Sequence, residues 1–132
     1  MKKSIRLLAL AMLTVMLCLT LASCGGPNAD PDKALENLKE NGLPLSVKVP
    51  NIVSGLGVDG VDCVVTGTGK IDDEYAHITI IYFEDSASAK DAWEDVQKFA
   101  DDEKGNDAKD WVCKKSGKMI YFGTKAAVKA AK

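Results

Sequence analysis

The stretch Tyr75–Phe83 constrains the fold of this chain more than any other feature. It is dominated by β-branched and aromatic residues, which favour a strand. The alternation of side chains divides it into two faces, Ala76, Ile78, Ile80 and Tyr82 on one and Tyr75, His77, Thr79, Ile81 and Phe83 on the other. Since Ile80 and Ile81 are adjacent, both faces are partly apolar. The pattern therefore predicts a strand in the middle of a sheet.

The segments around this strand predict a mixed fold. Asp30-Pro31 and Asp85-Ser86 are typical helix starts, and Ser116-Gly117 indicates a hairpin. Further strands are expected at 45–49 and 61–68, with a short final helix after Thr124. The order is α-β-β-β-α-β-β-α. Because hairpins replace alternating β-α units, we expect an α+β domain, with an antiparallel sheet of about five strands and helices packed mainly on one face.

The N-terminus has the pattern of an export signal. Residues 1–23 contain three basic residues and no acid, and 7–21 form an apolar run that is short for a membrane span. The run ends in Leu21-Ala22-Ser23-Cys24, which resembles the lipobox of bacterial lipoproteins. The resemblance implies diacylglyceryl transfer to the Cys24 thiol, cleavage after Ser23 and acylation of the new amine by a fatty acid such as palmitate. The alternative is an ordinary signal peptide with an incidental cysteine.

This resemblance divides the chain into three parts. Residues 1–23 are a signal peptide, 24–29 a short tether and 30–132 a single α+β domain. Gly25–Ala29 can span at most about 17 Å. Two or three acyl chains give stable anchoring, so the domain is expected outside the cytoplasm. It would be attached to the cell membrane of a monoderm host or the outer membrane of a diderm one. The segment 121–125 also resembles small bacterial lipoproteins of unknown function, and that resemblance implies no activity.

Charge and composition exclude some functions. The chain after residue 23 has fourteen lysines, no arginine and nineteen acids, a net charge of −5. A nucleic-acid binder needs a basic surface, so this composition argues against that class. The lack of arginine also removes the usual bidentate partner of carboxylates and phosphates. The apolar content is too high for intrinsic disorder.

The best candidate for a ligand site is a strip of Tyr75, His77 and Thr79, joined by Trp111 from the hairpin. Aromatic rings combined with hydroxyl groups bind sugars or peptides by stacking and hydrogen bonding. The strip would serve this purpose if the second face of the sheet is open. The alternative is that His77, the one histidine in the chain, has a purely structural role.

Other motifs point to structure rather than chemistry. Cys63 and Cys113 could form a disulfide worth about 4 kcal/mol or remain buried free thiols. Neither zinc nor another cofactor is expected, because there is no Cys-x-x-Cys and only one histidine. The glycines of 55–60 match G-x-G-x-x-G, but a strand follows them where a dinucleotide site needs a helix. The acidic groups at 72–74 and 101–103 read as solvated turns.

We therefore expect a lipid-anchored, non-enzymatic module that contacts an envelope protein or a small ligand through its sheet face or a strand edge. One alternative is a small envelope hydrolase that uses carboxylates or His77. A deep pocket that holds His77 beside a buried acid would favour that enzyme. The other alternative is a structural or inhibitory envelope protein.

Overall fold

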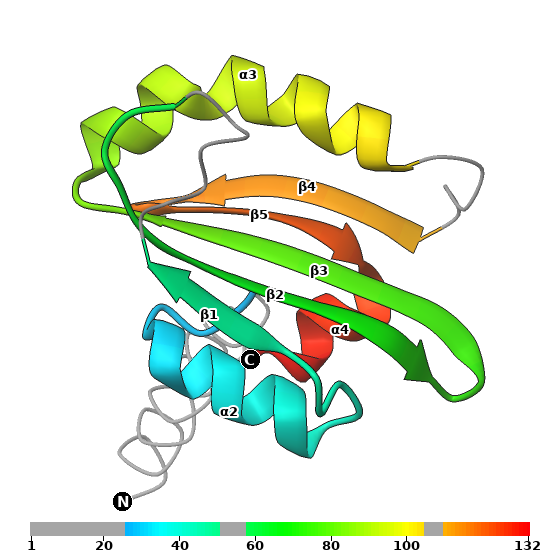
Figure 1. Ribbon diagram of the computed structural model, residues 1–132. Coiled ribbons are helices and arrows are strands. Elements are labelled where there is room, and N and C mark those ends of the chain that lie inside the picture. Colours follow the sequence, from blue (N-terminus) through cyan, green and yellow to red (C-terminus); the bar gives the residue numbers. More distant parts are fainter. Residues whose placement is uncertain (1–25, 51–57, 105–109) are drawn as a thin grey trace, which may run out of the picture.

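The computed structural model describes residues 26–50, 58–104 and 110–132, and within them it shows an antiparallel sheet of five strands in the order β1-β2-β3-β5-β4 (Figure 1). The α+β class and the order of elements are confirmed. The elements are α2 (Pro31–Glu40), β1 (Val47–Pro50), β2 (Val61–Ile71), β3 (Glu74–Phe83), α3 (Ser86–Lys104), β4 (Trp111–Ser116), β5 (Met119–Thr124) and α4 (Lys125–Ala130).

Strand β3 occupies the centre of the sheet, as its two apolar faces predict. It pairs with β2 on one side and with β5 on the other. Its two sets of side chains enter different cores: Ile78 and Ile80 belong to one apolar cluster, and Ile81 and Phe83 to another. The adjacent residues Ile80 and Ile81 are both fully buried. The sheet is thus the middle layer between two cores.

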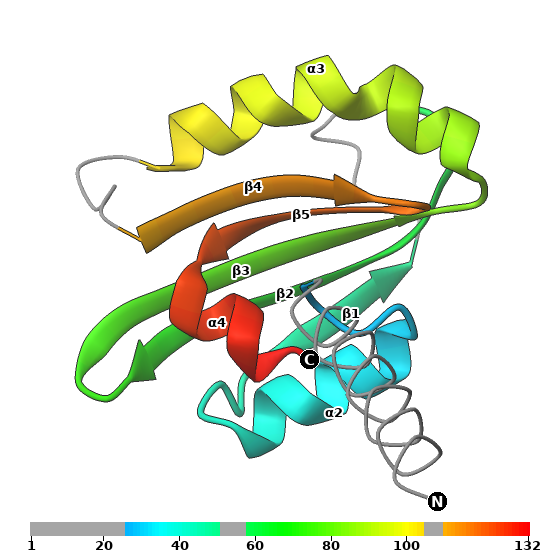
Figure 2. The same ribbon diagram turned by 180° about the vertical axis from the view of Figure 1, so that it is seen from behind.

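The helices lie on both faces of the sheet, which corrects the expectation that they pack mainly on one. Helix α3 covers one face, and α2 and α4 cover the other (Figures 1 and 2). The reason is the composition of β3. Each apolar face of a sheet must be covered, and this strand has two. We call the side covered by α3 the α3 face and the other side the α4 face.

Local signals place the starts of α2 and α3 where the sequence predicts them. The side chain of Asp30 accepts a hydrogen bond from the backbone N–H of Asp32 and caps α2. Asp85 does the same for α3 through the N–H of Ser88, at 2.7 Å. Thr124 precedes α4 but makes no side-chain cap. Its hydroxyl instead accepts the backbone N–H of His77 on β3.

Strand β1 is an edge strand, which agrees with Pro44 and Pro50 at the borders of the expected strand 45–49. The alternation of Leu45, Val47 and Val49 with polar residues predicts that the apolar side chains face the core, but the observed burial differs. Leu45 and Val47 are 83% and 50% exposed, whereas the polar Ser46 between them is buried. The Ser46 hydroxyl donates to the carbonyl of Leu43, at 2.7 Å. That bond satisfies the only polar group of the serine side chain and makes its burial inexpensive.

Residues 26–29, expected to be part of a free tether, lie against the domain. The N–H of Asn28 donates to the carbonyl of Ala131 at 2.8 Å, and the Tyr82 hydroxyl donates to the carbonyl of Asn28 at 2.7 Å. Pro27 is buried. A side chain on Gly26 would overlap the ring of Tyr121. This segment is therefore a packed part of the domain on the α4 face, because its backbone finds partners there.

Candidate functional site

The predicted strip lies on the α3 face, at the end of β3 that follows the β2–β3 turn. Tyr75, His77 and Thr79 alternate along this face of β3. Trp111, the first residue of β4, reaches His77 across the intervening strand β5. The His77 and Trp111 rings are stacked, with centroids 6.1 Å apart and planes at 4°. The structure thus brings together His77 and Trp111, which are distant in the sequence.

Both nitrogens of the His77 ring have hydroxyl partners. Nδ1 lies 2.8 Å from Oγ1 of Thr68, and Nε2 lies 3.1 Å from Oγ1 of Thr79. A hydroxyl can donate or accept, so the two threonines fit either neutral tautomer. Burial lowers the pKa of His77 below its usual value, and the charge of Glu103 opposes this effect. The ring is therefore held neutral and in one orientation.

A pair of phenylalanines, Phe122 and Phe99, lies beside the strip on the α3 face. Phe122 of β5 is fully buried, and its ring centroid is 6.4 Å from that of His77 and 6.1 Å from that of Trp111. Phe99 of α3 meets Phe122 edge to face, at 5.8 Å. These contacts fix the two rings of the strip from the core side.

The two ends of the strip differ in accessibility. Tyr75 is 51% exposed and lies two residues from His77 on the same face. Trp111 is half-buried, and its Nε1 is buried with no hydrogen-bond partner among the described residues. The strip is thus half-open. It presents a phenol, an imidazole edge and hydroxyl groups.

This geometry bears on the hydrolase alternative. A general base needs a free lone pair directed at the substrate, but each nitrogen of His77 is bonded to a threonine. Both of these partners are hydroxyl groups, so neither nitrogen is bonded to a carboxylate. The two described cavities, which lie elsewhere, are not lined by His77. The arrangement suits recognition better than proton transfer.

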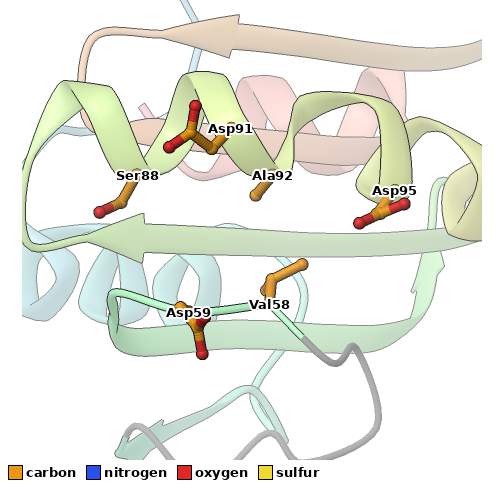
Figure 3. Close-up of a pocket in the computed structure, with 6 residues that line it drawn as sticks. All are labelled: Val58, Asp59, Ser88, Asp91, Ala92 and Asp95. Atoms are coloured by element: carbon orange, nitrogen blue, oxygen red, sulfur yellow. The ribbon is translucent and has the colours of Figure 1, made fainter.

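One cavity lies between α3 and the residues that precede β2 (Figure 3). It has a volume of about 220 Å³. Its lining comes from both sides, with Ser88, Asp91, Ala92 and Asp95 on α3 and Val58 and Asp59 opposite. Across residues 26–50, 58–104 and 110–132, no group of three or more histidines, cysteines or acids is placed to hold a metal ion.

A second cavity, of about 410 Å³, lies on the other side of the molecule beside the start of α2. Tyr82, Asp62, Glu84 and Lys118 contribute to its wall. It is a shallow, mixed-charge hollow with no nucleophile paired to a base.

Cys63 and Cys113 are free thiols, so the disulfide alternative is wrong. Cys63 lies on β2 in the core of the α4 face, and Cys113 lies on β4 against the core of the α3 face. Strands β3 and β5 separate them. Three strand spacings amount to about 14 Å, whereas bonded cysteines have Cα atoms within about 7 Å of each other. Burial raises the pKa of both thiols and keeps them protonated.

Sequence reasoning missed two residues of the site. Thr68 positions His77, and Phe122 supports both rings of the strip. The register of the β2–β3 hairpin, which pairs Thr68 with His77, contained the signal for the first. Phe122 required knowledge that β5, not β4, lies beside β3.

No protein-family model, curated protein or solved structure matches this chain. The strip therefore has to be interpreted from its own chemistry. The lipobox residues, the glycines of 55–57 and the leader lie outside the described part of the chain. Among the described helices, none has the length and apolar character needed to cross a bilayer.

Proposed function

We propose that this protein is a lipid-anchored, extracytoplasmic binding module, attached to the membrane through Cys24. We further propose that it binds a sugar or peptide at the strip of Tyr75, His77, Thr79 and Trp111. The anchor is supported by the basic start, the apolar run and the sequence Leu21-Ala22-Ser23-Cys24. The short leader cannot comfortably span the bilayer, and the acyl chains of a lipoprotein would replace it as the anchor.

The observation that carries the binding proposal is the fixed state of His77. Its ring is stacked on Trp111, bonded at both nitrogens and neutral. Tyr75 beside it is half-exposed. A surface of aligned rings and hydroxyls offers stacking to one flat face of a ligand and hydrogen bonds to its rim. Because these groups are held by the fold, little conformational entropy is lost when a ligand binds.

The two tryptophans of the chain allow a direct test. Trp93→Phe leaves Trp111 of the strip as the sole indole, and Trp111→Phe leaves Trp93 of α3. Each variant is titrated with cell-wall oligosaccharides and peptides while the tryptophan emission is recorded. We expect a saturable change in the Trp93→Phe variant and none in the Trp111→Phe variant.

A second substitution separates binding from a general quenching effect. Tyr75→Ala removes the exposed ring of the strip without touching the core, so it should weaken binding at least tenfold while leaving the fold intact. A panel in which no ligand changes the Trp111 emission, or in which Tyr75→Ala binds as well as its parent, contradicts the assignment of the strip.

A further inference from the structure

The lysines of this protein are concentrated at its C-terminal end. Residues 111–132 contain six lysines and no acid. Residues 30–110 contain eight lysines and all nineteen acids of the chain. The β4–β5 hairpin and α4 are therefore strongly basic, although the protein as a whole is acidic.

Two of these lysines lie beside the segment where the chain enters the domain, and two more are exposed on the neighbouring helix α4. Lys114 is opposite Tyr121 in the β4–β5 register and so projects from the α4 face. Gly26 packs on the ring of the same tyrosine. The backbone carbonyl of Lys132 accepts a hydrogen bond from the side chain of Asn28. Lys125 and Lys129 are exposed on α4.

None of these lysines forms a salt bridge with a residue in the described part of the chain. The one salt bridge there joins Lys48 to Asp32. Helix α2 shares the α4 face and is nearly balanced, with three acids and two lysines. The opposite face is different, because α3 carries six acids and only three lysines. The charge is thus divided between the two faces of the sheet.

We infer that the α4 face rests on the anionic headgroups of the bilayer to which the protein is anchored. The seat consists of Lys114, Lys125, Lys129 and Lys132, and it rests on the proposed attachment through Cys24. Only one residue separates Cys24 from Gly26, so about 8 Å of chain connects the lipidated cysteine to the packed segment. Anionic lipid repels the acidic α3 face and attracts the lysines.

The expected strength follows from the number of lysines. Each lysine close to an anionic leaflet favours the seated orientation about fivefold. The attraction decreases as salt shortens the Debye length to about 3 Å at 1 M. The anchor supplies the attachment and the lysines supply the orientation.

The test uses the mature protein, purified from membranes and reconstituted into vesicles. One set of vesicles contains equal parts of phosphatidylglycerol and phosphatidylcholine, and the other contains phosphatidylcholine alone. An amine-acylating reagent is added and each lysine is followed by mass spectrometry. Lys115 is the matched control, because it neighbours Lys114 but pairs with Ile120 and faces α3.

We expect the four lysines of the seat to react at least fivefold more slowly than Lys115 on anionic vesicles: Lys114, Lys125, Lys129 and Lys132. The difference should disappear on neutral vesicles and in about 1 M salt. Lys114→Gln combined with Lys129→Gln should release the protection of Lys132, whereas Lys115→Gln should not. Equal reaction of Lys114 and Lys115 on anionic vesicles overturns the seat.

Flotation with neutral vesicles separates this inference from the proposed anchor. If the protein floats with both kinds of vesicle but all its lysines react at the same rate, the anchor is supported and the seat is refuted. Protein that does not float with neutral vesicles refutes the anchor. If the lysines of such a protein are still protected on anionic vesicles, the seat is supported without the anchor. If they are not protected, both proposals are wrong.

Discussion

Truncation of Phe122 to alanine should unfold the protein partly and release the strip at the same time. Phe122 is fully buried and has ring contacts with His77, Trp111 and Phe99. Removal of a buried phenylalanine ring costs about 3–5 kcal/mol, the sum of lost burial and the cavity left behind. We expect about 4 kcal/mol, since rigid rings on three sides cannot close the cavity. For a domain of this size the melting temperature should fall by about 15–30 °C.

The assay is urea unfolding followed by circular dichroism and by the emission of Trp111 in a Trp93→Phe background. Phe99→Ala, at a half-buried position, should cost about 2 kcal/mol, and Tyr75→Ala less than about 1 kcal/mol. In the double variant Phe99→Ala/Phe122→Ala the two costs should fall short of additivity by about 0.5–1.5 kcal/mol. A cost below about 2 kcal/mol for Phe122→Ala, or one equal to that of Tyr75→Ala, would refute the role of Phe122 as the support of the strip.

Three further predictions concern other parts of the chain. Gly123→Ala should cost about 3 kcal/mol or more in urea unfolding, because a Cβ there would overlap the carbonyl oxygen of His77; Gly117→Ala, where a Cβ meets nothing within 4 Å, should cost only about 1 kcal/mol. Burial lowers the pKa of His77, so the unfolded chain takes up a proton first as the pH falls. Stability should then decline below about pH 6.5, and urea midpoints of His77→Gln should show a weaker decline. Cys24→Ala should leave an unlipidated precursor about 2.4 kDa heavier than the cleaved polypeptide, which intact-mass spectrometry would detect; a normally processed product would contradict the anchor.

The sequence predicts the centre of this fold well because the residues of β3 alone are enough to predict a central strand. Two adjacent isoleucines at its middle require burial on both sides, and a strand buried on both sides lies inside a sheet. The apolar stripe of α3 is equally informative. Its spacing predicts an apolar face of Ala89, Ala92, Trp93, Val96, Phe99 and Ala100. The three alanines and Val96 are buried, whereas Trp93 and Phe99 are partly buried against the same core.

The face of the sheet on which each helix packs was harder to predict, because the sequence of a helix contains no signal for that face. An apolar stripe shows that a helix is packed, but not on which face of a sheet. The strand pattern also misled at one position. Strict alternation along 61–68 predicts Val61, Cys63 and Val65 on one side, but the register shifts between Val61 and Cys63 and places these two residues in different cores. Such a bulge adds one residue to a strand and reverses the alternation on one side of it.

Only part of the candidate site could be predicted, because its residues on β3 follow from local alternation whereas Thr68 does not. Alternation along β3 put Tyr75, His77 and Thr79 on one face without any tertiary information. Thr68 depended on the turn, where Asp72 and Asp73 have φ of 52° and 65°. Two residues with positive φ form the kind of tight turn that usually contains Asn-Gly. Because an aspartate pair is a weak signal for that turn, the register that pairs Thr68 with His77 was not evident.

The division of the sheet into two faces connects the proposals made for this protein. The chain enters the domain on the α4 face, where Gly26 packs on Tyr121, Asn28 is hydrogen-bonded and the lysines of the seat lie. The strip lies on the other side, with the acidic α3. A protein attached through Cys24 and seated on its lysines would therefore direct Tyr75 and His77 away from the bilayer. Its ligand would then be a component of the surrounding envelope rather than a lipid of the membrane. Reversal of the charge at Lys114, Lys129 and Lys132 to glutamate should disturb this orientation without changing the affinity of the strip in solution, because the sheet separates the two surfaces.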